Sequence, residues 1–540
     1  MTDLKQIIRQ GDELFSKRSS LLSLWQDIGE QFYVERADFT VNRTLGEDFA
    51  SHLTSSYPII VRRELGDAIS GMLRPRGQQW MAISIDREDR LDNAGRKWLE
   101  RATKIQLRAM YDRATQFVRA TKEGDHDFAS FGQCVISKQV QWDKQALLYR
   151  CWHLRDVAWC ENSSGMIDEV HRNWEPTMRV IEQTFGTKQL HPSMLRAMKK
   201  DPYKTAKCRH VVMPAEYGSK SYRTPYVSMW LDLENNHVIR EEGANDLIYC
   251  IPRWVTVSGS QYAYSPATVA GLPDARLIQA MTLTLLEAGE MAVRPPLIAT
   301  KDAIRDDIAL YAGGITWADA EYDERLGEVL RPVFQDKSGL PFGVEIEQDR
   351  RQMLATAFYL NKLNLPPADR EMTAFETGQR IQEYIRNALP LFEPMETDYN
   401  GNLCEMTFND LMRVGAFGPA KDIPQSLRGE SVQFKFESPL HQAIERQKGT
   451  KFMEAKGLVL EAAQLDPGSV TTVIWRDALR DALNGIGIEA KWLRDEEEVE
   501  QKAAELEQAQ QAQAMMAQLQ QGAEAGEQVG KAGKALAEVA

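Results

Sequence analysis

Two long helical patterns, each followed by a pair of prolines, constrain this fold more than any other feature of the sequence. The first extends from about residue 267 or 274 to 294 and stops at Pro295-Pro296. The second covers about 347–363 and is broken by Pro366-Pro367, because proline lacks a backbone N–H and clashes with the preceding helical turn. The segment between them, 297–345, contains several glycines and prolines. The spacing therefore predicts two helices joined by a small α/β insert.

The rest of the chain combines helical and strand patterns, which predicts the α+β class. Short apolar segments between 128 and 260 have the length and alternation of strands, and Asn235-Asn236 predicts a hairpin turn between two of them. Apolar residues at every second position predict two further strands, at 81–85 and 432–436. Helical spacing covers 1–35, 58–72, 93–122, 370–387 and 439–493, and a Glu-, Gln- and Ala-rich tail follows from 494 to 540.

The sequence lacks the motifs that would indicate an enzyme. No P-loop occurs, since Gly530-Lys531 is followed by alanine, and neither G-x-S-x-G nor H-E-x-x-H is found. The glycines in 485–490 half match a dinucleotide-binding loop, but they follow a helical pattern instead of a strand. Cys151, His153 and Cys160 do not have the spacing of a zinc site, and the tryptophans between them indicate core packing. We therefore expect no catalytic residue, no cofactor and no metal.

Charge and cysteine content limit the partners and the location. The formal net charge is −13, whereas a protein that grips DNA is usually basic on its binding face. The chain is therefore either indifferent to nucleic acid or suited to let it slide. None of the six cysteines forms a C-x-x-C pair, which is typical of a reducing compartment. The apolar stretch 277–293 is interrupted by Gln279, Glu287 and Glu290, so we expect no membrane span and a location in the cytoplasm or inside a particle.

Four sequence blocks, in order along about residues 50–440, resemble those of one protein family. They are Ser55-Ser56 to Pro75 followed by 79–83, then 128–132, then Tyr264-Ser265-Pro266 through Asp274 to Pro295-Pro296, and finally Met372 to Glu376 with Arg380 and Glu383. In this order they resemble the head-to-tail connecting, or portal, proteins of short-tailed, podovirus-type bacteriophages. The chain departs from that family at Met81, where members often have Phe, and at Tyr264, where many have Gly. Each block taken alone is typical of core packing.

The resemblance implies the portal protein fold, which consists of a wing, a two-helix stem, an inserted α/β clip, a channel loop and a helical crown, and which assembles into a ring. On this sequence it assigns the wing to 1–266 and 371–438, the stem helices to 267–296 and 346–362, the clip to 297–345, the channel loop to 363–370, the crown to 439–495 and a helical or disordered tail to 496–540.

The resemblance also implies a structural, non-catalytic function. The expected assembly is a ring at one capsid vertex, in the family usually of twelve subunits. It would form the channel through which double-stranded DNA is packaged and ejected regardless of sequence. The terminase large subunit would dock first and the tail adaptor protein later. The major capsid, scaffolding and internal core proteins are further expected partners, without direct membrane contact. The location is the virion, after assembly in the host cytoplasm. Another phage structural protein, such as a tail adaptor or scaffold, is the alternative.

The channel of such a ring would bring basic residues close to DNA. Because an acidic wall keeps a duplex from sticking, a few basic rings could steady it as it moves. The same arginines fit a second interpretation equally well, in which they bridge neighbouring subunits. The candidates are Arg276, Arg294, Arg350 and Arg351 on the helices, and Lys362, Leu363, Asn364, Leu365, Pro366, Pro367 and Arg370 in and beside the loop.

Overall fold

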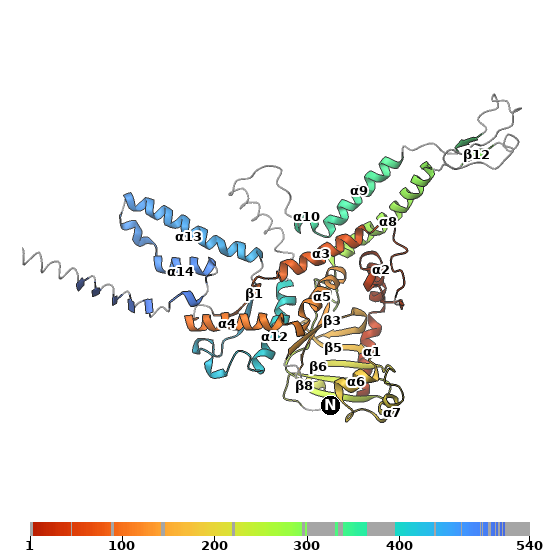
Figure 1. The fold of residues 1–540 in the computed structure, drawn as a ribbon, viewed down its shortest axis with the longest axis horizontal. Coiled ribbons are helices and arrows are strands. Elements are labelled where there is room, and N and C mark those ends of the chain that lie inside the picture. Colours follow the sequence, from red (N-terminus) through yellow and green to blue (C-terminus); the bar gives the residue numbers. More distant parts are fainter. Residues whose placement is uncertain are drawn as a thin grey trace, which may run out of the picture. The chain divides into compact units, whose positions relative to one another are not determined.

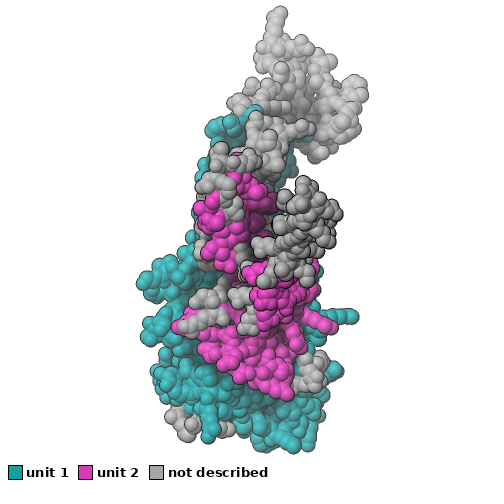
Figure 2. All heavy atoms as spheres, turned by 90° about the vertical axis from the view of Figure 1, so that its left-hand side faces the viewer, with its two compact units in different colours: residues 1–78, 109–410 teal, residues 79–108, 411–540 magenta. Residues whose placement is uncertain are grey.

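The chain folds into two compact units. Unit 1 comprises residues 1–78 and 109–410, and unit 2 comprises 79–108 and 411–540; Figure 2 colours them teal and magenta. This division cuts across the predicted wing, since 79–108 and 411–438 group with the C-terminal helices. The computed structural model describes residues 4–44, 46–87, 91–141, 146–218, 222–293, 297–299, 330–332, 339–363, 395–436, 439–465, 467–486, 488, 490–494 and short stretches between 498 and 512.

Unit 1 begins with two helices where the sequence analysis expects one. α1 (Leu4–Lys17) and α2 (Ser19–Phe32) are separated at Arg18. The Arg18 side chain is buried and donates hydrogen bonds to the carbonyl oxygens of Leu154 (2.6 Å) and Val157 (2.7 Å). A buried charge needs such partners, so the chain is fixed at this point and the helix is interrupted. The prediction of one continuous helix over 1–35 was therefore wrong.

The helix expected over 93–122 is also divided. α4 (Asn93–Met110) is followed by a short loop and then by α5 (Phe117–Phe131). Gln116, the residue before α5, has a φ of 55°, a left-handed conformation that cannot continue a right-handed helix. α3 (Tyr57–Leu73), in contrast, has the predicted Pro58 in its first turn, where proline is tolerated.

The largest described sheet of unit 1 has five antiparallel strands. Its strands are, in order, β4 (Val157–Glu161), β5 (Ile167–Trp174), β6 (Cys208–Pro214), β7 (Tyr226–Asp232) and β8 (His237–Ala244). The predicted hairpin turn lies between β7 and β8, and its Asn236 adopts a φ of 48°. A second sheet pairs β3 (Ala146–Trp152), β2 (Val135–Gln141) and β9 (Tyr249–Cys250). The β-rich character expected between 128 and 260 is confirmed.

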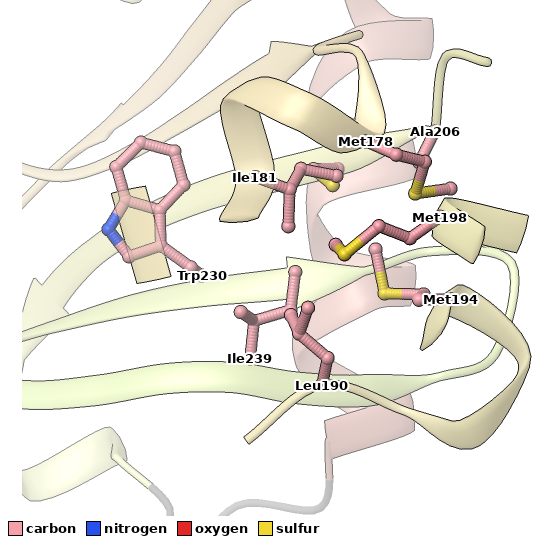
Figure 3. Packing of buried hydrophobic residues seen from close by; sticks show 9 residues of the cluster. Met178, Ile181, Leu190, Met194, Met198, Ala206, Trp230 and Ile239 are labelled. Atoms are coloured by element: carbon pink, nitrogen blue, oxygen red, sulfur yellow. The ribbon is translucent and has the colours of Figure 1, made fainter. Parts of the chain in front are cut away.

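Alternating side chains place two apolar cores on opposite faces of the larger sheet. On β7, Met229 faces α1 in a cluster with Ile7 and Val211, whereas its neighbour Trp230 faces α6 (Met178–Phe185) and α7 (Pro192–Lys200). Figure 3 shows this second cluster, in which Ile181 and Ile239 point toward the methionines of α6 and α7. The second cluster comprises Met178, Ile181, Leu190, Met194, Met198, Ala206, Cys208, Trp230 and Ile239.

Unit 2 is built on a two-stranded sheet of segments distant in sequence. β1 (Met81–Ile85) pairs antiparallel with β14 (Val432–Phe436), so Met81 lies opposite Phe436. Trp80 is 1% exposed and its ring stacks on that of Phe436 with a centroid distance of 6.5 Å. Both strands were predicted from alternation. The helices of this unit include α4, α13 (Pro439–Leu465) and α14 (Trp475–Ile486).

The other helices and strands of unit 1 include the predicted helix pair. They are β10 (Val255–Thr256), β11 (Ala263–Tyr264), α8 (Pro266–Val293), β12 (Leu297–Ala299), β13 (Leu330–Pro332), α9 (Gly339–Ala357), α10 (Leu360–Leu363) and α12 (Asn402–Arg413), the last of which continues into unit 2.

Among the helices that the structure describes, none is long and apolar enough to cross a bilayer.

Candidate functional site

Helices α8 and α9 form an antiparallel pair, seen in green in Figure 1. Arg350 lies 3.5 Å from the Asp274 carboxylate, and the Thr282 hydroxyl donates to Glu347 at 3.1 Å. Residue numbers therefore rise along α8 in the direction in which they fall along α9, so the two helices are antiparallel. Beyond the helices, β12 and β13 pair antiparallel in the first and last parts of the insert. The predicted helix pair is present, whereas residues 300–329 and 333–338 of the insert lie outside the described residues.

A close approach at a glycine holds the base of the pair together. A Cβ on Gly271 of α8 would lie 2.7 Å from Cδ1 of Leu354 and 3.1 Å from the ring of Phe358. Both side chains are fully buried, and the Phe358 ring packs on Phe32 with centroids 5.2 Å apart. The absence of a side chain at Gly271 thus allows the two helices to enter the core of unit 1 together.

Two of the sequence blocks that resemble the phage family meet where α8 begins. The Ser265 hydroxyl donates to the carbonyl of Ala129 at 2.7 Å, and the Thr268 hydroxyl donates to that of Ser130 at 2.7 Å. Gly132 ends α5 with a φ of 74°, and a Cβ there would collide with the backbone of Tyr264 and Ser265. The 128–132 and 264–267 blocks are therefore one packing unit, which fixes the direction in which α8 leaves the sheets.

Gln279 ties the middle of α8 to the loop before α3. Its side-chain oxygen accepts from the backbone N–H groups of Thr54 and Ser55, both at 2.8 Å, and its amide nitrogen donates to the Ser55 carbonyl at 2.8 Å. In the sequence, Gln279 was only an interruption of an apolar stretch. A polar residue in an apolar stretch indicates that its side chain has a specific hydrogen-bond partner. The sequence does not show which residue that partner is.

Large apolar side chains remain exposed along the pair. The exposed fraction is 47% for Leu283, 56% for Leu286 and 65% for Phe342. Exposed apolar side chains that gather along one element are typical of an interaction site. We call this set the α8–α9 apolar surface: Val269, Leu277, Leu283, Leu286, Met291 and Val293 on α8, and Phe342, Val344 and Met353 on α9.

Three of the candidate arginines pair with carboxylates of the same chain. Arg276 lies 2.9 Å from Asp27, and Arg350 lies 3.5 Å from Asp274. Arg351 pairs with Glu347, and its guanidinium lies 5.4 Å from the centre of the Tyr57 ring. Each positive charge is thus balanced locally within the subunit. Contact of these residues with DNA, or with a neighbouring subunit, stays a prediction.

Two of the remaining candidates, Lys362 and Leu363, lie in α10, which follows α9. Tyr359, between α9 and α10, has a φ of 58°, so the chain turns sharply there. Lys362 is exposed on α10, with its ammonium 5.8 Å from the centre of the Tyr359 ring, and Leu363 is the last residue of α10. Six candidates, Arg294, Asn364, Leu365, Pro366, Pro367 and Arg370, lie outside the described residues, as does the helix expected over 370–387.

Cys151 and His153 each contact a carboxylate of unit 1, and the packing interpretation of these two residues and Cys160 stays a prediction. The His153 ring nitrogen lies 2.6 Å from the Asp38 carboxylate, and the Cys151 thiol donates to Asp127 at 3.6 Å. Burial, reinforced by the charge of Asp127, raises the pKa of the Cys151 thiol. Within the described ranges, no three histidine, cysteine or acidic side chains are grouped so that they could hold a metal ion.

The sequence matches the model of a family described as bacteriophage head to tail connecting protein over residues 4–493. It is 22% identical to the probable portal protein of Bordetella phage BPP-1, covering 94% of each chain. It is 18% identical to the portal protein of Salmonella phage epsilon15, covering 86% of this chain and 84% of that protein.

Two chains of gene transfer agent (GTA) particles superpose weakly. A chain of the native GTA virion has 9% identity and a TM-score of 0.34, covering 79% of this chain and 94% of that one. A chain of the neck of the empty GTA particle has 11% identity and the same TM-score of 0.34, covering 78% and 93%. Scores this low do not establish a shared fold.

Proposed function

This chain belongs to the bacteriophage head to tail connecting protein family, and we propose that it is the subunit of a portal ring at one vertex of the capsid. The ring forms the channel through which the genome is packaged and later ejected. Its role is structural, and none of its residues performs a chemical step. The family match over 4–493 supports this proposal, as do two phage relatives named portal proteins.

The α8–α9 apolar surface is the observation that best supports a ring. Side chains such as Leu286 and Phe342 are more than half exposed, on a helix pair that bonds to the rest of unit 1 from its base to Gln279 in the middle of α8. Burying them against the same helices of a neighbour removes apolar area from water, worth about 25 cal/mol per Å². Head-to-tail contacts of this kind close into a ring when the rotation between subunits allows it. We propose twelve subunits.

The parts of the subunit follow the family plan. In this proposal the stem is 267–296 and 346–362, of which α8 and α9 form most, and the clip is 297–345. The first turns of α9, from Gly339, fall in the range assigned to the clip. The pairing of β12 with β13 supports this assignment, because it brings the two sides of the insert together. Residues 363–370 are the channel loop. The wing, 1–266 and 371–438, contacts the capsid, and the helical crown is 439–495.

The charges of the stem suit a channel that lets DNA slide. The exposed charged groups of α8 and α9 include four carboxylates, whereas Arg276, Arg350 and Arg351 each pair with an acid. An acidic wall weakens phosphate binding, which would otherwise hold the duplex with a steep salt dependence. The exposed carboxylates are Glu287, Glu290, Glu345 and Asp349.

The terminase motor, tail adaptor, major capsid, scaffolding and internal core proteins are the proposed partners.

The native mass of the purified protein, with negative-stain images of the same sample, tests this function. Twelve copies of a 61.3 kDa chain have a mass of about 736 kDa. We expect a ring near that mass, with a central hole wide enough for duplex DNA. A protein that stays monomeric or dimeric at high concentration would contradict the portal function and favour a tail adaptor.

A further inference from the structure

Helix α4 of unit 2 has a line of cations along one face. Lys97, Arg101, Lys104 and Arg108 follow one another at intervals of four, three and four residues, and all four are exposed. Residues three and four apart lie one above the other on a helix, so these side chains share a single face. We call these four residues the basic stripe. Figure 1 shows α4 in orange.

The basic stripe lines a hollow of about 310 Å³ to which a distant part of the chain contributes another cation. Lys491, in a short helical turn at Ala490–Trp492, lies on its wall. Among the described residues of the lining, Glu100 is the one carboxylate. The five cations and one carboxylate of this described set have a net charge of +4, whichever of these groups pair with one another. That local excess stands out in a chain whose net charge is −13.

The opposite face of α4 fixes the stripe in position. Leu99, Ala102 and Gln106 are buried, and the Trp98 ring contacts that of Phe417 with centroids 6.0 Å apart. The Thr103 hydroxyl accepts a hydrogen bond of 3.0 Å from the backbone N–H of Ile83, which ties α4 to strand β1. The helix that carries the cations is therefore already held in place before an anion binds.

The length of the stripe indicates an extended anion. Lys97 and Arg108 are eleven positions apart, which is about 16 Å along a helix that rises 1.5 Å per residue. Duplex DNA carries one negative charge per about 1.7 Å of its axis, so a duplex alongside the stripe would present about ten charges to it. A single phosphate ion could use only one part of such a line.

We propose that the basic stripe binds the phosphate backbone of duplex DNA without reading its sequence, at a site separate from the paired helices α8 and α9. The choice of DNA rests on the proposed function, in which DNA is the polyanion that the ring handles. The two surfaces then have complementary properties. The acidic helix pair lets the duplex pass, whereas the stripe on unit 2 holds it.

The test measures binding of a fluorescent 30-bp duplex of arbitrary sequence to the full-length protein by anisotropy, over a range of salt concentrations. The stripe variant carries Lys97→Gln, Arg101→Gln, Lys104→Gln and Arg108→Gln. Loss of four phosphate contacts should weaken binding at about 0.1 M salt by at least about tenfold, and should flatten the plot of log K against log salt by about 3 to 4.

A control variant removes the same charge from another helix. Arg196, Lys199, Lys200 and Lys204, in and after α7, are exposed, and changing all four to Gln should leave DNA binding nearly unchanged. Equal losses in the two variants would mean that only net charge matters, which overturns the proposal. Equal affinity of the stripe variant and the wild type would also overturn it, and would fit an acidic protein segment as the occupant.

Two further measurements keep the result interpretable. Circular dichroism checks folding. If the fourfold variant does not fold, the double variant Arg101→Gln, Arg108→Gln replaces it and should show about half of the change in salt slope.

Native mass is recorded on the same samples. Rings that do not bind DNA through the stripe refute this inference alone, whereas failure of the wild type to form rings refutes the proposed function.

Discussion

His210 lies inside the five-stranded sheet with both ring nitrogens bonded. Its ring stacks on Trp230 at a centroid distance of 4.0 Å, Nε2 lies 2.8 Å from the Ser228 hydroxyl, and Nδ1 lies 2.5 Å from the Tyr249 hydroxyl. Arg172 donates to the same Tyr249 oxygen at 2.9 Å, so the tyrosine proton points to a neutral imidazole. Burial, and then the positive charges of Arg172 and His171, lower the pKa of His210 well below 6.5.

This arrangement predicts a loss of stability in acid. In the unfolded chain the His210 side chain is protonated near pH 6.5, whereas in the folded chain it stays neutral. The free energy of unfolding should therefore fall as the pH drops below that value. The slope is about 1.4 kcal/mol per pH unit for each such proton. Burial lowers the pKa of His126 too, which adds to the slope. Urea unfolding between pH 7.5 and 5.5 measures it.

His210→Asn should reduce that slope, whereas His52→Asn should leave it unchanged, because His52 is exposed and bonds to no buried group in the described part of the chain. Identical slopes for the wild type and His210→Asn would show that another group is responsible.

At the scale of the element, local signals in the sequence predicted where α8 and α9 lie but not how they are held. The first proline pair and the apolar spacing were sufficient for α8. The second helix was expected over about 347–363, whereas α9 begins at Gly339 and ends at Ala357, before the turn at Tyr359. The breaks at Arg18 and Gln116 were missed, because they depend on distant carbonyl groups and on a left-handed residue that is not glycine. The contact of Gly271 with Leu354 joins residues far apart in the sequence, which spacing alone does not reveal.

Leu354→Ala tests the packing of the helix pair. Leu354 is fully buried against Gly271, so truncation leaves a cavity and should lower the free energy of unfolding by about 2–5 kcal/mol in urea titrations. The adjacent Met353 is 46% exposed, and Met353→Ala provides a matched control with a change below about 1 kcal/mol in the unassembled subunit. Similar losses in both variants would mean that α9 is not anchored through this contact.

The basic stripe shows a different limit of sequence interpretation. The spacing of Lys97, Arg101, Lys104 and Arg108 was visible within the helix predicted over 93–122. A net charge of −13 gives no information on where basic residues gather, so the composition did not predict this surface. Lys491 could not have been added, since only the folded chain brings it to α4.

For the whole molecule, the ordered sequence blocks indicated the family correctly, whereas the two compact units were not foreseen. Residues 79–108 were assigned to the wing, yet β1 and α4 group with 411–540 because β1 pairs with β14. A strand pair separated by about 350 residues cannot be read from local periodicity. The division into wing, stem, clip and crown stays a prediction at this scale.

Assembly should depend on the α8–α9 apolar surface. Leu283→Glu with Leu286→Glu places two charges where the neighbour is expected, and the side chains are already exposed in the subunit, so its fold should be retained. Native mass should shift from the ring to smaller species. Met166→Glu with Val180→Glu, at exposed apolar positions elsewhere in unit 1, should leave the ring intact. Rings that persist in the first variant would exclude this surface as the subunit contact.

The pairing of β1 with β14 also has a consequence for synthesis of the chain. A ribosome that adds about 5–20 residues per second needs about 20–70 s to proceed from Ile85 to Val432. During that interval Trp80 and the apolar side chains of β1 have no partner strand, and a chain terminated before Val432 never acquires one. Unit 2 can therefore complete its fold only after translation has passed Val432. If assembly requires a folded unit 2, chains that end before this residue cannot enter the particle.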